Sequence, residues 1–245
     1  GWEQSFTFIE SFGTDALLGD GLRVIVLRTA DAELAVAISG FETWSSTDRM
    51  LADGDDALAA SLGMIPDQLS HLESYLNGVA DRHGPIQWIV GQSLGAYLTQ
   101  CLLSWDDSAI AENARYLMFD TPGVTLTHLK RLANHRGVDS QVIAERLRAG
   151  EVLIIEHNVF NTTGVWPGKS FSLEMAPASG GFRFDLQEHT IGRFAALVGH
   201  DERWTHFRQV SDRQPKPFPG TPIFISVLLL AVIGVILFLR RKALV

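Results

Sequence analysis

The stretch that most constrains the fold of this chain is residues 86–97, which read IQWIVGQSLGAY. An apolar run rich in β-branched residues ends in the pattern G-x-S-x-G, formed by Gly91, Ser93 and Gly95, and a helix-compatible run over 96–105 follows. This order predicts a buried strand, a sharp turn and a helix. Glycine on either side of the serine leaves room for a crowded backbone. We therefore expect Ser93 on the turn, with its hydroxyl exposed as a nucleophile would need.

Strand and helix signals alternate along most of the chain. Runs typical of strands occupy 22–27, 33–38, 115–119 and 151–155, in addition to the strand that ends before Ser93. Amphipathic, helix-compatible runs occupy 66–84, 126–134, 141–148 and 188–198. Strands interleaved with helices of this length indicate an α/β fold with a mostly parallel central sheet.

Length, charge and cysteine content limit the further possibilities. The chain has 245 residues, enough for one core domain, expected over 1–210, and an appendage. Its net charge of −8 gives no sign of a nucleic-acid partner. Cys101 is the single cysteine, so an intrachain disulfide and a multi-cysteine metal site are excluded, and we expect it in the core. No cofactor or metal is predicted. The chain opens on Gly1 without methionine, as a processed or excised chain would.

The C-terminal region has a different character. Residues 223–239 form an uncharged apolar run of roughly 17 residues, close to the length that crosses a bilayer core. A proline-rich spacer over 211–222 precedes it, and a tail over 240–245 that begins with three basic residues follows it. We expect a single-pass membrane helix. The basic tail favours a cytoplasmic C-terminus and a domain outside the cytoplasm, whereas basic residues before the run leave the orientation open.

Three segments together resemble a known family. Residues 91–96 resemble the G-x-S-L-G-[GA] turn of the class 3 (fungal-type) lipases and their bacterial α/β-hydrolase relatives. Residues 35–41 are similar to the strand that ends in F-R-G-T in those lipases, although Ser39 and Phe41 replace the arginine and the small hydroxyl residue. Residues 119–123 resemble the F-D-x-P-G segment of uncharacterised bacterial relatives. The resemblance spans roughly residues 20–200 and implies an α/β-hydrolase fold with ester hydrolysis.

A serine nucleophile needs a histidine as its general base. In α/β-hydrolases the histidine follows both the nucleophile and the acid along the chain. Of the eight histidines, His189 has the D-x-x-x-H setting that resembles the lipases, and His200 is the alternative. The remaining histidines fit less well. His71 and His83 precede the nucleophile, and His157 comes too early for this order. His128 and His135 are expected on a solvated helix face, and His206 lies close to the spacer.

The acid and the oxyanion hole complete the expected site. Asp120 ends the strand after the one that leads to Ser93, although it could instead cap the turn that follows; Glu156 and Asn158, after the next strand, are alternatives for the acid. The backbone amide of Leu94, directly after the nucleophile, is one expected oxyanion donor. The resemblance points to the amide of Phe41 as the second donor, although Phe41 could also be a core residue.

Two classes of function remain open from the sequence. One is a serine ester hydrolase, which forms an acyl-enzyme and acts on lipid esters such as phospholipids at the membrane that anchors it. The other is a membrane-anchored domain that kept the hydrolase fold without the chemistry. Thioesterases and acyltransferases share this fold, so they stay as further alternatives. Protein partners are not predicted.

Overall fold

The computed structural model describes residues 6–13, 22–39, 64–105, 107–119, 121, 124, 126–148 and 150, and the backbone of 151–155, 169–173 and 207–209. Its strands are β1 (Thr7–Gly13), β2 (Arg23–Arg28), β3 (Leu34–Ile38), β4 (Ile86–Gln92), β5 (Ile110–Phe119), β6 (Glu151–Ile155), β7 (Lys169–Leu173) and β8 (Phe207–Gln209). Its helices are α2 (Gln68–His83), α3 (Leu94–Leu103), α4 (Leu126–Arg136) and α5 (Ser140–Leu147).

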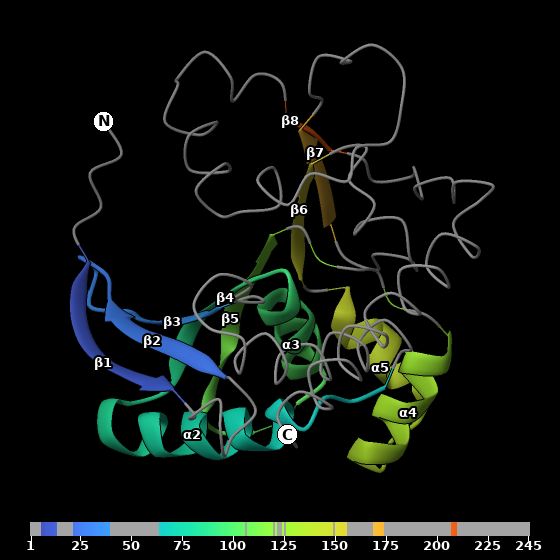
Figure 1. The fold of residues 1–245 in the computed structure, drawn as a ribbon, viewed down its shortest axis with the longest axis horizontal. Helices are drawn as coiled ribbons and strands as arrows, with labels where there is room; N and C mark the ends of the chain where they lie inside the picture. Colours follow the sequence, from blue (N-terminus) through green and yellow to red (C-terminus); the bar gives the residue numbers. More distant parts are fainter. Residues whose placement is uncertain are drawn as a thin grey trace, which may run out of the picture.

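The strands form one mixed sheet in which they lie side by side in the order of the sequence (Figure 1). Strands β3 to β7 pair in parallel, while β1 and β2 at one end and β8 at the other end add antiparallel pairs. The α/β class and the parallel centre of the sheet are confirmed. The mixed character at the two ends was not predicted.

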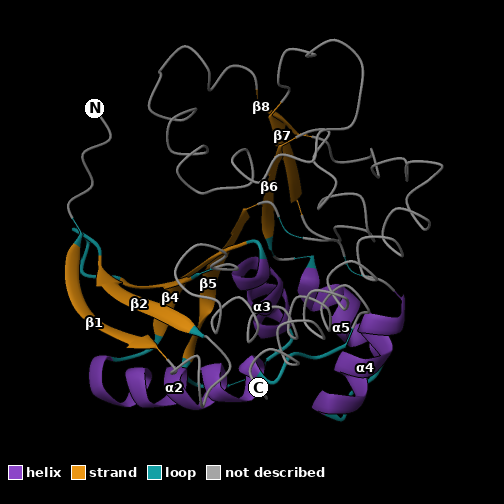
Figure 2. Cartoon of the chain, in the orientation of Figure 1, coloured by secondary structure: helices purple, strands orange, loops and turns teal. Residues whose placement is uncertain are grey.

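Helix α3 contacts β3, β4 and β5 and also packs against α2 and α5 (Figure 1), while α4 and α5 lie side by side (Figure 2). All ten residues of α3 are buried, as expected for a helix without a polar face. This central position explains why the sequence after Ser93 is mainly apolar, with Thr99 and Gln100 as buried polar members.

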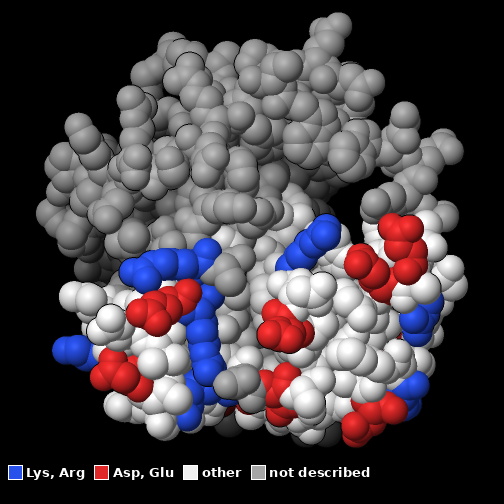
Figure 3. Space-filling model, turned by 180° about the vertical axis from the view of Figure 1, so that it is seen from behind, with Lys and Arg blue, Asp and Glu red and all other residues white. Residues whose placement is uncertain are grey.

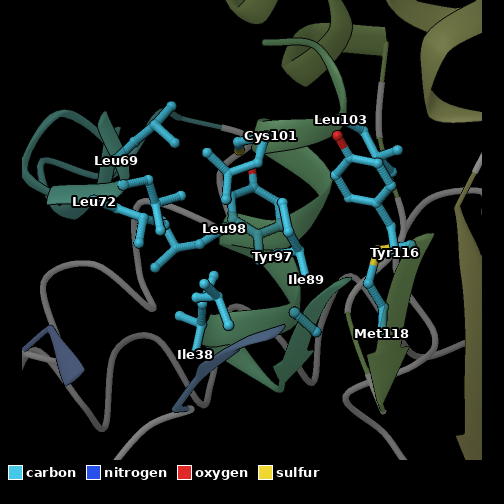
Figure 4. Packing of buried hydrophobic residues seen from close by; sticks show 14 of the residues in the cluster. Ile38, Leu69, Leu72, Ile89, Tyr97, Leu98, Cys101, Leu103, Tyr116 and Met118 are labelled. Carbon is cyan, nitrogen blue, oxygen red and sulfur yellow. The ribbon is translucent and has the colours of Figure 1, made fainter. Parts of the chain in front are cut away.

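The core lies between the helices and one face of the sheet. Val24 and Val26 of β2 are buried, whereas Ile25 between them is 45% exposed, so the strand alternates between an inner and an outer face. Figure 4 shows side chains of the inner face, such as Ile89, packed against leucines of α2 and α3. The predicted strand at 22–27 therefore has its period of two because one face meets the helices.

Several boundaries differ from the predictions. Strand β5 begins at Ile110 rather than at 115, and α3 begins at Leu94, directly after the predicted nucleophile. Strands β1, β7 and β8 were not predicted at all. The predicted helix over 188–198 lies outside the described residues.

The membrane prediction concerns a part of the chain that the structure does not describe. Within the described ranges, no helix has both the length and the apolar character needed to cross a bilayer. The apolar run at 223–239, the spacer and the basic tail all lie outside these ranges.

Charged side chains of the described residues lie mainly at the surface. On the face shown in Figure 3, acidic and basic groups alternate rather than gather by sign. An exception to this surface placement is the ion pair between Arg136 of α4 and Glu73 of α2, whose side chains are only 10% and 16% exposed. This pair lies at the end of α3 opposite to Ser93.

Candidate active site

Ser93 has the backbone conformation of a strained turn residue. Its φ of 55° and ψ of −118° place it in a region that side-chain-bearing residues rarely adopt. Among the described non-glycine residues, only Ala32 shares a positive φ. Such a conformation costs on the order of 1–3 kcal/mol and persists where the surrounding structure enforces it. The strand–turn–helix prediction is thus confirmed, with Ser93 between the last residue of β4 and the first residue of α3.

The two glycines of the motif are required by close packing. A Cβ on Gly91 would lie 2.3 Å from the carbonyl oxygen of Gly95 and 2.4 Å from Oγ1 of Thr99. A Cβ on Gly95 would lie 2.3 Å from the carbonyl oxygen of Ile38 and 2.4 Å from that of Ser39. No side chain larger than hydrogen fits at either position without a backbone shift. The glycines therefore let α3 start directly against the ends of β3 and β4.

The carboxyl ends of three strands meet around Ser93. Ile38 of β3 is in register with Gly91 of β4, and Gln92 of β4 is in register with Phe119 of β5. The Ser93 amide donates a 2.9 Å hydrogen bond to the Phe119 carbonyl. In a parallel sheet, the carboxyl ends of adjacent strands are where ligands bind. The turn is thus fixed to a strand on each side of β4.

The N-terminus of α3 begins at the same point. The first backbone hydrogen bond of the helix runs from the Tyr97 amide to the Ser93 carbonyl, at 3.1 Å. The amides of the first turn, including that of Leu94, precede this bond and have no partner within the helix. The Ser93 side chain makes no cap hydrogen bond to them. Aligned amide dipoles at such an end favour a developing negative charge, as an oxyanion hole does.

Of the predicted site residues, Ser93 and Leu94 are described, and both lie at the start of α3. The other predicted site residues lie outside the described ranges. They are Phe41 as the second oxyanion donor, Asp120 as the acid with its alternatives Glu156 and Asn158, and His189 as the base with its alternative His200. The structure therefore describes the nucleophile end of the predicted site and leaves its other members as predictions.

His128 corrects one expectation. We expected it on a solvated helix face, but it is completely buried, with its ring stacked 4.7 Å from that of Tyr97. Desolvation lowers the pKa of His128 to about 4. His128 lies four residues before the buried Leu132, so both side chains are on the inner face of α4. This spacing is visible in the sequence and could have predicted the burial of His128. His135 on the same helix is exposed, as expected.

Cys101 confirms the prediction of a core cysteine. Its thiol is buried, and desolvation raises the pKa of Cys101 to about 12. The sulfur lies 3.6 Å from Nε2 of His128. Since the thiol stays protonated and closed off from solvent, Cys101 acts as a small apolar residue.

Among the described residues, no group of three or more potential ligands could hold a metal ion.

A polar contact beside the predicted acid in the sequence was not predicted. Gln100 of α3 donates from Nε2 to Oγ1 of Thr121, the residue that follows Asp120. Both side chains are buried, at 2% and 0% exposure. The signal in the sequence was a single carboxamide in an otherwise apolar segment, because a buried amide generally requires a hydrogen-bond partner.

Comparison with known proteins gives distant likenesses only. No family model and no curated protein matches the chain. Among solved structures, it is similar to two structures of the Rhizomucor miehei lipase propeptide complex. The deletion mutant matches with 10% sequence identity and a TM-score of 0.42, and the native complex with 11% identity and a TM-score of 0.35. It is also similar to the extracellular lipase LipA of Serratia marcescens (15%, 0.40). Each match covers 69% of this chain. The matches cover 56% of the deletion-mutant chain, 57% of the native Rhizomucor chain and 28% of the Serratia chain.

These neighbours are lipase-related, but the likeness is weak, and the chain spans little more than half the length of the Rhizomucor chains. The α/β class rests instead on the elements and the strand order. The conformation of Ser93 and the contacts around it mark this turn as the candidate site.

Proposed function

We propose that the protein is a serine carboxylic-ester hydrolase that acts on lipid esters. The observation that carries this proposal is the backbone of Ser93, held at positive φ between a parallel strand and a buried helix. A serine in a regular turn would relax into a common conformation. The close packing at Gly91 and Gly95 supports the strained one, which is the conformation typical of a serine nucleophile on a strand-to-helix turn.

The proposed chemistry has two steps. The Ser93 hydroxyl attacks the acyl carbonyl while His189 accepts the hydroxyl proton, and His189 then donates that proton to the leaving alcohol. Water, activated by the same imidazole, releases the acyl group from the acyl-enzyme. The amide of Leu94, joined in the proposal by that of Phe41, stabilises the negative oxygen of each tetrahedral intermediate.

Asp120 is the proposed acid that orients His189. In the sequence it follows Phe119, whose carbonyl accepts a hydrogen bond from the Ser93 amide. Glu156 follows β6, one strand farther from β4. Adjacent strands are about 4.8 Å apart, so β6 lies farther from β4 and the serine turn than β5 does. Asn158 would orient the ring without a charge and would stabilise the imidazolium less.

Covalent labelling tests the nucleophile directly. A fluorophosphonate probe should modify the purified full chain at Ser93, and Ser93→Ala should abolish both labelling and hydrolysis of p-nitrophenyl esters. Ser70→Ala is the matched control, because Ser70 is exposed on α2 and its hydroxyl donates to the Asp67 carbonyl in the same helix turn. Labelling that persists in Ser93→Ala would refute the nucleophile. A folded chain that resists the probe would support the non-catalytic alternative.

The base and the acid are tested in pairs. His189→Ala and Asp120→Asn should each lower kcat for the ester by roughly a thousandfold or more, because triad members act as a unit. His200→Ala and Glu156→Gln should leave kcat within a fewfold of the wild type. The reverse pattern within either pair would move that role to the alternative residue and leave the nucleophile in place.

Lipid esters are the proposed substrates because of the apolar run at 223–239. A membrane helix would hold the hydrolase at a lipid surface and raise its effective concentration there. Two arginines in the run, Leu230→Arg with Ile233→Arg, should move the full chain from carbonate-washed membranes to the soluble fraction, since each costs about 3 kcal/mol at the helix centre. An unchanged membrane fraction would refute the anchor, while esterase activity on soluble substrates would still test the hydrolase separately.

A further inference from the structure

Both neighbours of Asp120 are hydrogen-bonded to the segment that carries the nucleophile. On one side, the Phe119 carbonyl accepts the Ser93 amide at 2.9 Å. On the other side, the Thr121 hydroxyl accepts the Gln100 side-chain amide. Phe119 and Thr121, the residues on either side of Asp120 in the sequence, are therefore both hydrogen-bonded to the segment that carries Ser93.

Gln100 is unusual among its neighbours. Every residue of α3 is buried, and the positions around Gln100 are mainly apolar. A carboxamide in such a place is unfavourable unless it is hydrogen-bonded, and a leucine of similar size would be easier to bury. The side chain therefore has a role beyond filling space. Its side-chain amide donates to Thr121, which is itself completely buried.

The helix geometry relates this contact to Ser93. Gln100 lies seven residues after Ser93, so it returns to nearly the same side of the helix about two turns farther on. Helix α3 contacts both β4 and β5. One rigid helix thus fixes the turn that holds Ser93 at its start and, through Gln100, the segment that follows β5.

We propose that Gln100 and Thr121 are positioning residues for Asp120. This inference rests on the proposed function, in which Asp120 orients the catalytic histidine. The two hydrogen bonds hold the segment after β5 in a fixed place relative to Ser93. The carboxylate then meets the imidazole at the distance that stabilises the imidazolium as the serine is deprotonated.

Thr121→Val and Gln100→Met test this role, because each removes one hydrogen-bonding group and nearly keeps the side-chain volume. Each should lower kcat for a soluble p-nitrophenyl ester roughly tenfold or more, with KM unchanged within about twofold, since the acyl pocket is not altered. The acid limb of kcat/KM should move to lower pH, because a displaced carboxylate stabilises the imidazolium less. Thr121→Ser, which keeps the accepting hydroxyl, should restore kcat and the pH profile.

The double variant separates this role from a general loss of folding. If the two residues act through their shared bond, Gln100→Met with Thr121→Val should lower kcat no further than the worse single variant. Active-site titration with the fluorophosphonate corrects each kcat for the fraction of folded enzyme. A loss of kcat that disappears after this correction, with an unchanged pH profile, would overturn the inference.

Asp120→Asn, assayed in parallel, distinguishes the two possible failures. If Asp120→Asn is inactive while both Thr121→Val and Gln100→Met retain the wild-type kcat and pH profile, the positioning role is wrong and the proposed triad stands. If Asp120→Asn keeps wild-type activity, the assignment of the acid fails, and the positioning role fails with it. If Ser93→Ala retains activity, the proposed function itself fails.

Discussion

The two ends of α3 are built in opposite ways. At the N-terminus, Ser93 is held in a strained conformation and its side chain makes no cap hydrogen bond to the first turn. At the C-terminus, Arg146 donates to the Ser104 carbonyl at 2.8 Å, and Arg136 donates to Oγ of Ser104 at 3.2 Å. The Ser104 hydroxyl in turn donates to the carbonyl of Cys101 at 2.6 Å.

This difference shows which end stabilises the helix and which end is available for chemistry. Cationic side chains at a helix C-terminus satisfy terminal carbonyls and offset the negative end of the dipole. An N-terminus without a side-chain cap keeps its positive end for an incoming group. A folded protein supports strain at one point of a helix when contacts elsewhere stabilise the same helix. The hydrogen bonds around Ser104 stabilise the C-terminal end of α3 in this way.

The largest expected effect comes from filling the space at the strained end. Gly95→Ala should lower the free energy of unfolding by roughly 3 kcal/mol or more, because its Cβ meets backbone oxygens that cannot rotate away. Gly78→Ala in α2 is the control, since its Cβ would meet only the flexible side chain of Arg82, at 3.1 Å. That control should be neutral or more stable by up to about 1 kcal/mol. Equal urea midpoints for the two variants would contradict the close packing.

The next effect concerns His128, which packs against Cys101 near the stabilised end of α3. The folded chain keeps this imidazole neutral down to about pH 4, whereas an unfolded chain protonates it below about 6.5. Between these values the unfolded state binds more protons, so the free energy of unfolding falls as the pH falls, by about 3 kcal/mol in total. His128→Leu should remove this part of the slope in urea titrations.

His135→Leu on the exposed side of α4 is the matched control and should keep the slope. If His135→Leu, and not His128→Leu, flattened the dependence on pH, then His128 would not be the buried group that resists protonation.

A smaller effect is expected from the ion pair between Arg136 and Glu73. Arg136→Met should lower the free energy of unfolding by roughly 2 kcal/mol, because the Glu73 carboxylate keeps little exposure and loses its partner. Lys130→Met, at an exposed position of the same helix, should change it by less than about 0.5 kcal/mol. The rate of fluorophosphonate labelling per folded molecule should stay the same in Arg136→Met. A slower rate would mean that the two ends of α3 are not independent.

The smallest effect is a gain in stability at the nucleophile. Glycine adopts the backbone angles of Ser93 without strain, so Ser93→Gly should be more stable than Ser93→Ala by about 1 kcal/mol while both are inactive. Thermal unfolding of the two variants side by side measures this difference. Equal melting temperatures would show that the turn is relaxed, which would remove the main support for the proposed nucleophile.

The features that were predicted correctly, the serine turn and the inner strands, have clear patterns within short stretches of the sequence. The motif identified the turn at Ser93 because Gly91 packs against Gly95 and Thr99 within one short segment, although the contact of Gly95 with Ser39 is not local. The inner strands were predicted for a similar reason, because burial beneath α2 and α3 gives them apolar runs. Strand β8 has only three residues, too short for any period to appear.

Contacts between distant segments were harder to predict. The burial of His128 depends on Tyr97 and Cys101, about thirty positions away, and a basic neighbour such as Lys130 obscured its place on the inner face of α4. The bond between Gln100 and Thr121 likewise joins two segments that no motif connects. For the same reason the base and the acid stay predictions, since their place in a site depends on packing rather than on spacing in the sequence.

The sequential order of the strands bears on how the chain folds. In the described sheet, each strand from β2 to β7 is paired with the strand before it and the strand after it in the sequence, and β1 and β8 form the two edges. Each strand can therefore be added to the sheet in the order in which it is synthesised, starting from the N-terminal edge. Loop closure is least favourable for the longest connection, and between β2 and β6 this is the step from Ile38 to Ile86. Closing that loop brings β3 beside β4 and creates the contact between Gly95 and Ser39, so the slowest step of assembly would also be the one that forms the serine turn.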